Sequence, residues 1–533
     1  MPAEAILVTR PILPAMRRLI VLLALATLLA SCAGPTAAAP GRPVRILAGT
    51  PTTLDPAAAG DAGSSSVIAQ VFESLTAFDA DLQVRPALAE SWQFTDGGRR
   101  VTFHLRPNLT YSDGSPLRPS DVVRSWMRLI DPAHPSPLAS LAFDIKGAEA
   151  YLRGVSADPG LVGLHADDAA GTLVVDLVRP ATDFVNIVAG PSFSVVPPGV
   201  GSDASALKAG AGFVASGGYI LASATDAGLG LKANPRYWAG PPAITDIELV
   251  SDLGGKSVVD AFTAGDLDYT SVSGIDATWL AYDETLGRQL RLVGSLSVLY
   301  YGFDASQPPF DDVRVRQAFG KAVDWRRIAA LSSGEAAQVA NSMVPPGIPG
   351  RSAADFLPPY DPADARRLLA KAGYPGGVGF PTTTLMTGGM GFDAAVAREI
   401  ERELGITLQA ETMADGYFER LATDAPAMWA LGWVADYPGR NDFLGVLLGS
   451  GASNNYGKWS SPTSDAAIAD AVSAADPVLA SAAYDRAEAV VRDEVPVVPV
   501  EYGPGWALSR TGLLGAGQNG LGIVRMAGLA WAD

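Results

Sequence analysis

The chain has 533 residues, which is long enough for two or three substantial lobes. Its 48% hydrophobic and 18% charged residues are typical of a folded globular protein and exclude a disordered chain or a polytopic membrane protein. The formal net charge of −17 disfavours nucleic acid as a partner, because binding a polyanion needs a basic face. The charge does not restrict a small ligand, since one pocket can hold a charge of either sign.

The first 31 residues have the layout of an export signal. Residues 16–18, Met-Arg-Arg, precede an apolar run at 19–30 that is too short to span a bilayer as a permanent helix. The run ends in Leu-Ala-Ser-Cys at 29–32, which looks like a bacterial lipobox, so we expect cleavage before Cys32 and a diacylglycerol anchor on its thiol. Cys32 is the only cysteine, which excludes an internal disulfide. The alternative is a plain secretory signal with a chance cysteine.

Two further features surround this signal. Residues 1–15 precede an otherwise complete signal and contain Pro11 and Pro14, so we expect translation to start at Met16. The N-terminal peptide of the unprocessed precursor would test this expectation. Residues 32–43 are rich in Ala, Gly and Pro, and they are expected to form a flexible tether between the anchor and the folded part.

Strand and helix patterns follow one another along the rest of the chain. Apolar alternation and short apolar runs predict strands at 44–47, 101–105, 172–177 and 496–500, and helical spacing predicts helices at 65–76, 120–130, 314–330 and 361–372. Ser120 is the expected N-cap of its helix, and Trp92 and Trp126 are expected core residues. This mixture indicates an α/β or α+β protein with several lobes.

Residues for common catalytic chemistry are scarce. The three histidines, His104, His134 and His165, have no acidic or cysteine neighbour at metal-ligand spacing, so we expect no metal site. Neither a Gly-x-Ser-x-Gly elbow nor a phosphate-binding loop is present, and the Gly-Ala-Gly at 210–212 does not follow a predicted strand. The inventory favours a binding protein without cofactor or metal over an enzyme.

A series of segments, in order, carries a resemblance to one family. They are Leu-Asp-Pro at 54–56, Val-Phe-Glu-Ser-Leu-Thr at 71–76, Pro-Ala-Leu-Ala-Glu-Ser-Trp at 86–92, Thr-Phe-His-Leu-Arg at 102–106, Ser-Asp-Gly-Ser-Pro-Leu at 112–117, Gly-Gly-Tyr at 217–219, Asn-Pro-Arg-Tyr-Trp at 234–238, Pro-Phe-Asp-Asp-Val-Arg-Val-Arg-Gln-Ala at 309–318 and Gly-Trp-Val-Ala-Asp-Tyr-Pro at 432–438. From about residue 44 to about residue 510 the chain resembles the family-5 extracellular solute-binding proteins, the peptide receptors of ABC importers.

The resemblance implies an α/β architecture of the type II periplasmic-binding-protein fold, with two lobes joined by a hinge and a small inserted third domain. The implied division is lobe I at 44–75, the inserted domain at 76–185, lobe I again at 186–300, lobe II at 301–498 and a return to lobe I at 499–533. The ligand would be enclosed as the lobes close, and we expect a monomer.

Three residues follow as ligand-binding candidates. By its place in the family pattern, Asp436 would pair with the α-ammonium group of a bound peptide, Trp433 would line the pocket, and Tyr502 would lie near the ligand. The alternatives are that Asp436 only orders a loop and that both aromatic residues belong to the core. Some oligopeptide binders have an arginine just before the Gly-Trp pair, where this chain has Trp-Ala-Leu at 429–431, and residues 438–442 also depart from the family pattern. A preferred peptide length therefore does not carry over.

The implied function is capture of di- to oligopeptides by a receptor that is lipid-anchored at the outer face of the cytoplasmic membrane, and their delivery to an ABC permease. The permease and its ATPase would be separate chains, because the sequence has neither membrane spans nor nucleotide loops. One alternative is a same-fold receptor for haem, a metal chelate or a sugar. A secreted hydrolase of cell-wall peptides would need a Ser-His-Asp cluster, and a structural or signalling lipoprotein would have a filled cleft.

Overall fold

The computed structural model describes residues 42–181, 183–200, 209–210, 212–332, 338–413, 416–474, 476–503 and 505–532. The chain divides into two compact units, Met1–Arg42 and Pro43–Asp533, and all described residues except Arg42 belong to the second. Cys32, the expected signal and the expected tether up to residue 41 lie outside the described residues. None of the helices in the described ranges combines the length and the apolar character needed to cross a membrane.

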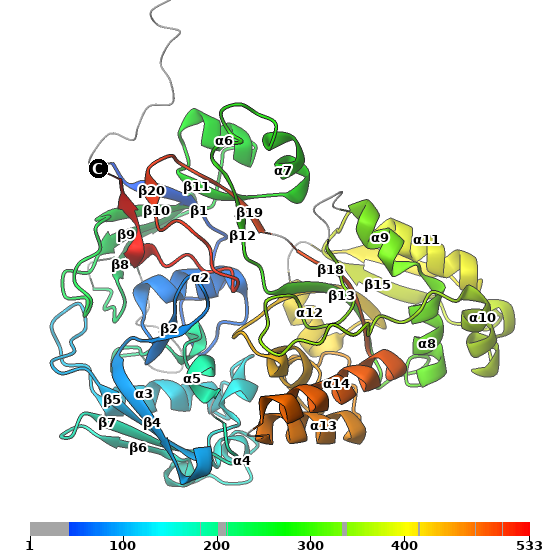
Figure 1. The fold of residues 1–533 in the computed structure, drawn as a ribbon, viewed down its shortest axis with the longest axis horizontal. Helices are drawn as coiled ribbons and strands as arrows, with labels where there is room; N and C mark the ends of the chain where they lie inside the picture. The colour runs from blue at the N-terminus through cyan, green and yellow to red at the C-terminus, as the bar shows by residue number, and fades with distance from the viewer. Residues whose placement is uncertain are drawn as a thin grey trace, which may run out of the picture. The chain divides into compact units, whose positions relative to one another are not determined.

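A seven-stranded sheet combines segments from both ends of the second unit (Figure 1). In spatial order its strands are β12 (Leu290–Val293), β19 (Gly505–Ser509), β11 (Tyr269–Val272), β1 (Val44–Leu47), β10 (Asp246–Val250), β9 (Gly228–Ala233) and β8 (Tyr219–Thr225). β1 lies parallel to β10 and β11, and β19 inserts antiparallel between β11 and β12. The C-terminal part of the chain thus returns to the sheet that the N-terminal strand begins.

A six-stranded sheet forms the centre of the second half of the chain. Its order is β14 (Gln338–Val339), β18 (Val497–Tyr502), β13 (Ser297–Phe303), β17 (Met428–Val434), β15 (Thr383–Thr387) and β16 (Leu408–Thr412). β13 and β18 carry the chain into and out of this sheet, and they span the positions 301 and 498 at which the lobe boundaries are expected. These crossings are where a hinge is expected.

A separate four-stranded sheet is formed by the chain between β1 and β8 of the seven-stranded sheet. Its order is β4 (Ala89–Thr95), β5 (Arg100–Leu105), β7 (Thr172–Asp176) and β6 (Leu164–Asp167), and the small pairs are β2 (Thr76–Phe78) with β3 (Val84–Pro86) and β20 (Leu513–Leu514) with β21 (Ala530–Trp531). Trp126 is buried and makes edge-to-face contacts with Phe103, Phe184 and Phe193, as expected for a core residue. Trp92 is partly buried and packs against the same cluster.

Helices flank these sheets. They are α2 (Ala62–Val71), α3 (Pro119–Met127), α4 (Ala148–Leu152), α5 (Phe184–Ile187), α6 (Val258–Ala264), α7 (Gly274–Leu280), α8 (Val313–Ala322), α9 (Trp325–Ser332), α10 (Pro362–Lys371), α11 (Asp393–Leu404), α12 (Tyr417–Asp424), α13 (Pro462–Ser473) and α14 (Pro477–Glu494). α13 and α14 pack side by side (Figure 1). Single 3-10 turns and one π-helical turn, Asp442–Val446, complete the described helical structure.

Two predicted helices begin or end elsewhere. The helix predicted at 65–76 starts earlier, because Asp61 caps it by accepting a hydrogen bond from the Ser64 N–H, and it ends at Val71 so that Thr76 can begin β2. Ser120 is not the N-cap of α3. Pro119 occupies the first turn, which suits proline because its missing N–H has no helical partner there.

The helix predicted at 314–330 is two helices, α8 and α9. The chain leaves the helical conformation at Val323, which is extended, and resumes at Trp325. The Trp325 indole N–H donates to the Gly320 carbonyl oxygen, which binds the start of α9 back onto the end of α8. Apolar spacing continues through the break because each of the two helices buries an apolar face. Periodicity alone therefore does not reveal the break between them.

Candidate ligand-binding site

The site begins with an open edge on β17. Along one edge, β13 pairs with all of Met428–Val434. Along the other edge, β15 pairs only with Met428 and Trp429, so in the described part of the chain the segment 431–434 has no strand partner on that side. Unpaired backbone N–H and C=O groups at a sheet edge can bind an extended chain as an added strand.

Asp436 follows directly beyond this edge. The Ala435 N–H donates to the Leu296 carbonyl oxygen at 2.9 Å, which fixes the chain where β17 ends. Asp436 as a whole is half-buried, but its Oδ2 is buried and has no hydrogen-bond partner among the described residues. Burial raises the pKa of its carboxyl to about 7. A desolvated carboxyl without a protein cation is suited to a cationic group supplied from outside.

Asp442 is a second carboxyl in the same site. It is fully buried, and its Oδ2 accepts hydrogen bonds from the Trp433 indole N–H at 2.9 Å and from the Asp436 backbone N–H at 3.2 Å. Its Oδ1 has no partner among the described residues. Burial, and then the negative charge of Asp436, raise the pKa of Asp442 well above its usual value. Asp442 therefore connects the two expected ligand-binding residues, Trp433 and Asp436.

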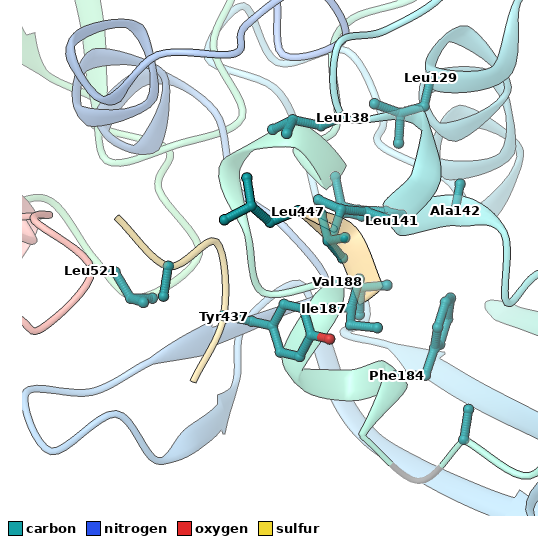
Figure 2. Packing of buried hydrophobic residues seen from close by; sticks show 14 of the residues in the cluster. Leu129, Leu138, Leu141, Ala142, Phe184, Ile187, Val188, Tyr437, Leu447 and Leu521 are labelled. Carbon is teal, nitrogen blue, oxygen red and sulfur yellow. The ribbon is translucent and has the colours of Figure 1, made fainter. Parts of the chain in front are cut away.

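Tyr437 turns away from this carboxyl pair into the apolar core. Figure 2 shows its ring beside Ile187 and Val188, which belong to α5 and its C-terminal cap. The Tyr437 hydroxyl accepts a hydrogen bond from the Asn441 side-chain amide at 3.1 Å, and burial raises the pKa of Tyr437 well above its usual value. Tyr437 is thus an uncharged anchor that holds the Asp436 loop against the segment around α5.

Arg440 anchors the same loop on its other side. Its buried guanidinium donates to the carbonyl oxygens of Gly350 at 2.9 Å and Ser481 at 3.1 Å, and it pairs with Asp485 at 2.7 Å and with the buried Glu488 of α14. The charge of Arg440 is therefore neutralised by carboxylates of α14. The loop that carries Asp436 is fixed by core packing and by this ion-pair network.

The structure places Tyr502 in a different environment. Tyr502 ends β18, which flanks β13 on the side opposite to β17. Its hydroxyl accepts from the Ser342 N–H at 3.0 Å and from Arg351 at 3.1 Å, and it donates to the Ser342 carbonyl oxygen at 2.8 Å. The structure brings Trp433 and Asp436 together but binds Tyr502 to the Ser342 segment. A ligand contact of Tyr502 stays a prediction.

A hollow of about 450 Å³, partly open to solvent, lies next to the Asp436 backbone. Gly190 lines it, and a methyl group built on Gly190 would lie 3.7 Å from the Asp436 carbonyl oxygen. Three segments form the wall, and the lining residues are Ala69, Phe72, Glu73, Ser74, Ala77, Phe78, Ala189, Gly190, Pro191, Ser194, Asn519, Leu521, Ile523 and Arg525. This hollow offers space beside the loop, although Trp433 and Asp436 are not part of its wall.

Sequence reasoning missed Asp442 and Arg440. Both lie in the stretch 438–442, where the chain departs from the family pattern, and that departure was the available signal. An acidic residue immediately before the apolar Phe443 and Leu444 is a second signal, since an ionisable group at the start of a buried turn needs a partner. In the described ranges, no group of three or more His, Cys, Asp or Glu side chains is arranged to hold a metal ion.

Comparison with known proteins gives a consistent picture. Residues 83–455 match the family model described as bacterial extracellular solute-binding proteins, family 5 middle. The probable deoxycholate-binding periplasmic protein YgiS of Escherichia coli (strain K12) is 30% identical over 471 residues, covering 85% of this chain and 86% of that protein. The periplasmic oligopeptide-binding protein OppA of Salmonella typhimurium is 29% identical over 470 residues, covering 84% and 85%.

A solved structure extends this likeness to three dimensions. The structure of the Escherichia coli murein tripeptide binding protein MppA superposes with a TM-score of 0.83 at 26% identity, covering 92% of this chain and 98% of that chain. Two of these relatives are named for binding peptides and one for probable binding of deoxycholate. The similarity therefore extends over nearly the whole chain, while ligand class differs among the relatives.

Proposed function

The chain belongs to family 5 of the bacterial extracellular solute-binding proteins, and from this premise we propose that it captures short peptides and delivers them to an ABC permease. The peptide main chain adds to the open edge of β17, and the peptide α-ammonium group binds Asp436. No bond is broken, and release depends on the lobes opening again.

The observation that carries this proposal is the position of the unpartnered Asp436 oxygen. It lies two residues beyond the end of β17, whose edge at 431–434 has no strand partner in the described ranges. An extended ligand on that edge therefore reaches Asp436 with one end. An α-ammonium group supplies the positive charge and the hydrogen-bond donors that a buried carboxylate lacks here.

Binding through the main chain gives affinity that does not depend on the side chains of the peptide. The residues before the Gly432 and Trp433 pair are consistent with such tolerance. Trp429 and Leu431 are buried, and the Ala430 carbonyl oxygen accepts a hydrogen bond from Tyr417. Because none of these side chains is charged, this part of the site does not select charged peptide side chains.

We further propose that the mature protein is tethered to the outer face of the cytoplasmic membrane through diacylglycerol on Cys32, and that it works as a monomer with a separate permease and ATPase. The support is the lipobox pattern at 29–32. Mass spectrometry of the mature N-terminus is expected to show a lipidated Cys32. An unmodified cysteine, or a mature chain starting beyond it, would remove the anchor from the proposal.

Calorimetric titration of the ligand-free protein tests peptide capture. A pool of mixed tetrapeptides with free N-termini is compared with the same pool after N-acetylation. We expect the acetylated pool to bind at least tenfold more weakly, which corresponds to about 1.4 kcal/mol. Asp436→Asn is expected to lose a comparable part of the affinity, and Asp470→Asn, an exposed aspartate paired with Arg486, serves as the matched control. Equal binding of both pools would contradict the proposal.

One observation favours a second candidate function, capture of an amphipathic anion. The relative named for probable deoxycholate binding is 30% identical over most of the chain. The same calorimeter separates the two candidates, because the Asp436 carboxylate attracts an ammonium group but repels a ligand carboxylate. Asp436→Asn should weaken peptide binding and strengthen deoxycholate binding. Heat with deoxycholate and none with peptides would make this second function the leading one.

A further inference from the structure

The carboxyl group of Asp442 lies against the Asp436 backbone and is close enough to the Asp436 carboxyl to feel its charge. The Asp442 Oδ2 accepts the Asp436 backbone N–H at 3.2 Å, so the two residues are connected directly. Each carboxyl has one buried oxygen without a hydrogen-bond partner among the described residues, Oδ2 in Asp436 and Oδ1 in Asp442. The charge of the site therefore depends on how many protons these two carboxyl groups hold.

Charged groups on the neighbouring elements do not neutralise the pair. Arg440 pairs with Asp485 and Glu488 of α14. On α13, Asp465 accepts the Ser450 N–H and Asp470 pairs with Arg486 of α14. Around α5 the charged groups are Asp183 and the Asp144–Arg179 ion pair. Each of these arginines is engaged by other carboxylates, and the described residues contain no ion pair to Asp436 or Asp442. The site has no internal counter-charge in the described ranges.

Two adjacent buried carboxyls without a cation cannot both ionise near neutral pH, because burial and mutual repulsion both favour retaining a proton. The geometry also indicates which residue keeps it. Asp442 is 0% exposed, while Asp436 is half-buried and is the better solvated of the two. The Asp442 Oδ2 already accepts two N–H donors, so the proton belongs on Oδ1, which accepts none.

We propose that Asp442 keeps its proton at neutral pH, so that the site presents a single carboxylate, Asp436, to a single cationic nitrogen. Acidification then prevents cation binding, because it protonates Asp436 as well. The inference rests on the proposed function in that the nitrogen is the α-ammonium group of a peptide. Asp442 then acts as a specificity-determining residue: it holds Trp433 and the Asp436 backbone in place without adding a second negative charge.

Binding of a cation at Asp436 should be coupled to the release of a proton. Because burial raises the pKa of Asp436 to about 7, a cation that binds at pH 6 must displace most of a proton, while at pH 8 it displaces only a small fraction of one. The affinity for free-amine peptides should fall roughly tenfold for each pH unit below 7. An anionic ligand would show the opposite sign, proton uptake.

The first experiment needs no ligand. The infrared spectrum of the unliganded full-length protein at pH 8 is compared with that of Asp442→Asn, and the difference is expected to contain the C=O stretching band of one protonated carboxyl group, lost in the variant. Asp442→Asn keeps an acceptor for Trp433 and replaces the O–H by an N–H. If the difference spectrum shows the loss of an ionised carboxylate instead, Asp442 is charged and the proposal is wrong.

The second experiment measures proton release by calorimetry of the free-amine tetrapeptide pool at pH 6 in two buffers with different ionisation enthalpies. A net release of protons supports the proposal; no exchange, or uptake, contradicts it. At pH 8, Asp442→Asn should bind at least tenfold more tightly than Asp442→Ala, since only the amide reproduces the protonated acid; equally weak binding by both variants would contradict it. If no peptide binds, the proposed function fails, and the infrared result still decides whether Asp442 is protonated.

Discussion

Two aspartates with buried carboxylate oxygens differ in their hydrogen-bond partners. Asp55, in the loop after β1, is 2% exposed, and Arg128 donates to both of its carboxylate oxygens at 2.8 and 2.6 Å. The Ala57 N–H adds a further hydrogen bond at 3.0 Å. Asp436 is also desolvated, but its Oδ2 has no partner in the described part of the chain.

The presence or absence of a protein counter-charge distinguishes a carboxylate that stabilises the fold from one that is available to a ligand. A carboxylate that stabilises the fold needs a counter-charge within the protein, since a buried charge without one is costly. A carboxylate that binds a cationic ligand must have no counter-charge from the protein, so the ligand-free protein is less stable than it would be with one. Asp55 follows the first pattern, and we propose that Asp436 follows the second, although both belong to segments that resemble the same family.

The largest expected effect comes from breaking the scaffold pair. Asp55→Ala removes two charge-assisted hydrogen bonds from the Arg128 guanidinium, whose side chain is only 10% exposed, and we expect it to lower the free energy of unfolding by about 3 to 5 kcal/mol. Urea denaturation followed by fluorescence measures this loss. A loss below about 1 kcal/mol would mean that solvent reaches Arg128 and that the pair is not part of the core.

Asp436→Asn should have the opposite sign in the ligand-free protein. The folded-state pKa of Asp436 is raised from the usual 3.8 to about 7, so between pH 4 and 7 the folded protein holds a proton that the unfolded chain has lost. The contribution of Asp436 to stability therefore falls as pH rises through this window.

We expect Asp436→Asn to raise the free energy of unfolding at pH 8 by on the order of 1 to 3 kcal/mol and to change it little at pH 4. Thermal unfolding at both pH values, in protein shown to be free of co-purified ligand, measures the effect. A destabilised variant at pH 8 would indicate that Asp436 has a protein partner, which would contradict the comparison with Asp55.

Trp433→Phe tests the connection between the ring and the carboxyl pair. The change keeps an aromatic ring but removes the indole N–H that donates to Asp442 at 2.9 Å, so we expect a loss of about 1 to 2 kcal/mol in the free energy of unfolding. Peptide affinity should also fall, because the Asp436 loop loses a restraint. Unchanged stability and affinity would show that the hydrogen bond does not hold the site.

The smallest effect is expected at an exposed ion pair. Asp470 and Arg486 join α13 and α14 at 2.8 Å, but both side chains are more than half exposed. Asp470→Ala should change the free energy of unfolding by less than about 1 kcal/mol, with no effect on peptide binding, in the same assays. A loss as large as that of Asp55→Ala would mean that burial does not explain the difference between the pairs.

Much of the fold was predictable from local patterns. β1 and β5 were expected almost residue for residue, and the aromatic contacts of Trp126 confirm it as a core residue. The separation of α8 from α9 was not predictable from periodicity, because the extended residue Val323 interrupts the backbone without interrupting the apolar spacing. Alternating and helical spacing report which face is buried and say little about where a helix stops.

The sequence by itself determined the family and the α/β class, because these depend on residue order and on spacing along one chain, and it predicted a ligand-binding role for Asp436. Only the tertiary structure decided which carboxylates are neutralised and which are left open. Arg128 reaches Asp55 across 73 positions, and the open edge of β17 exists because β15, far away in sequence, stops pairing after Trp429. Counter-charges and unpaired strand edges are properties of neighbours in space, and the order of residues does not state them.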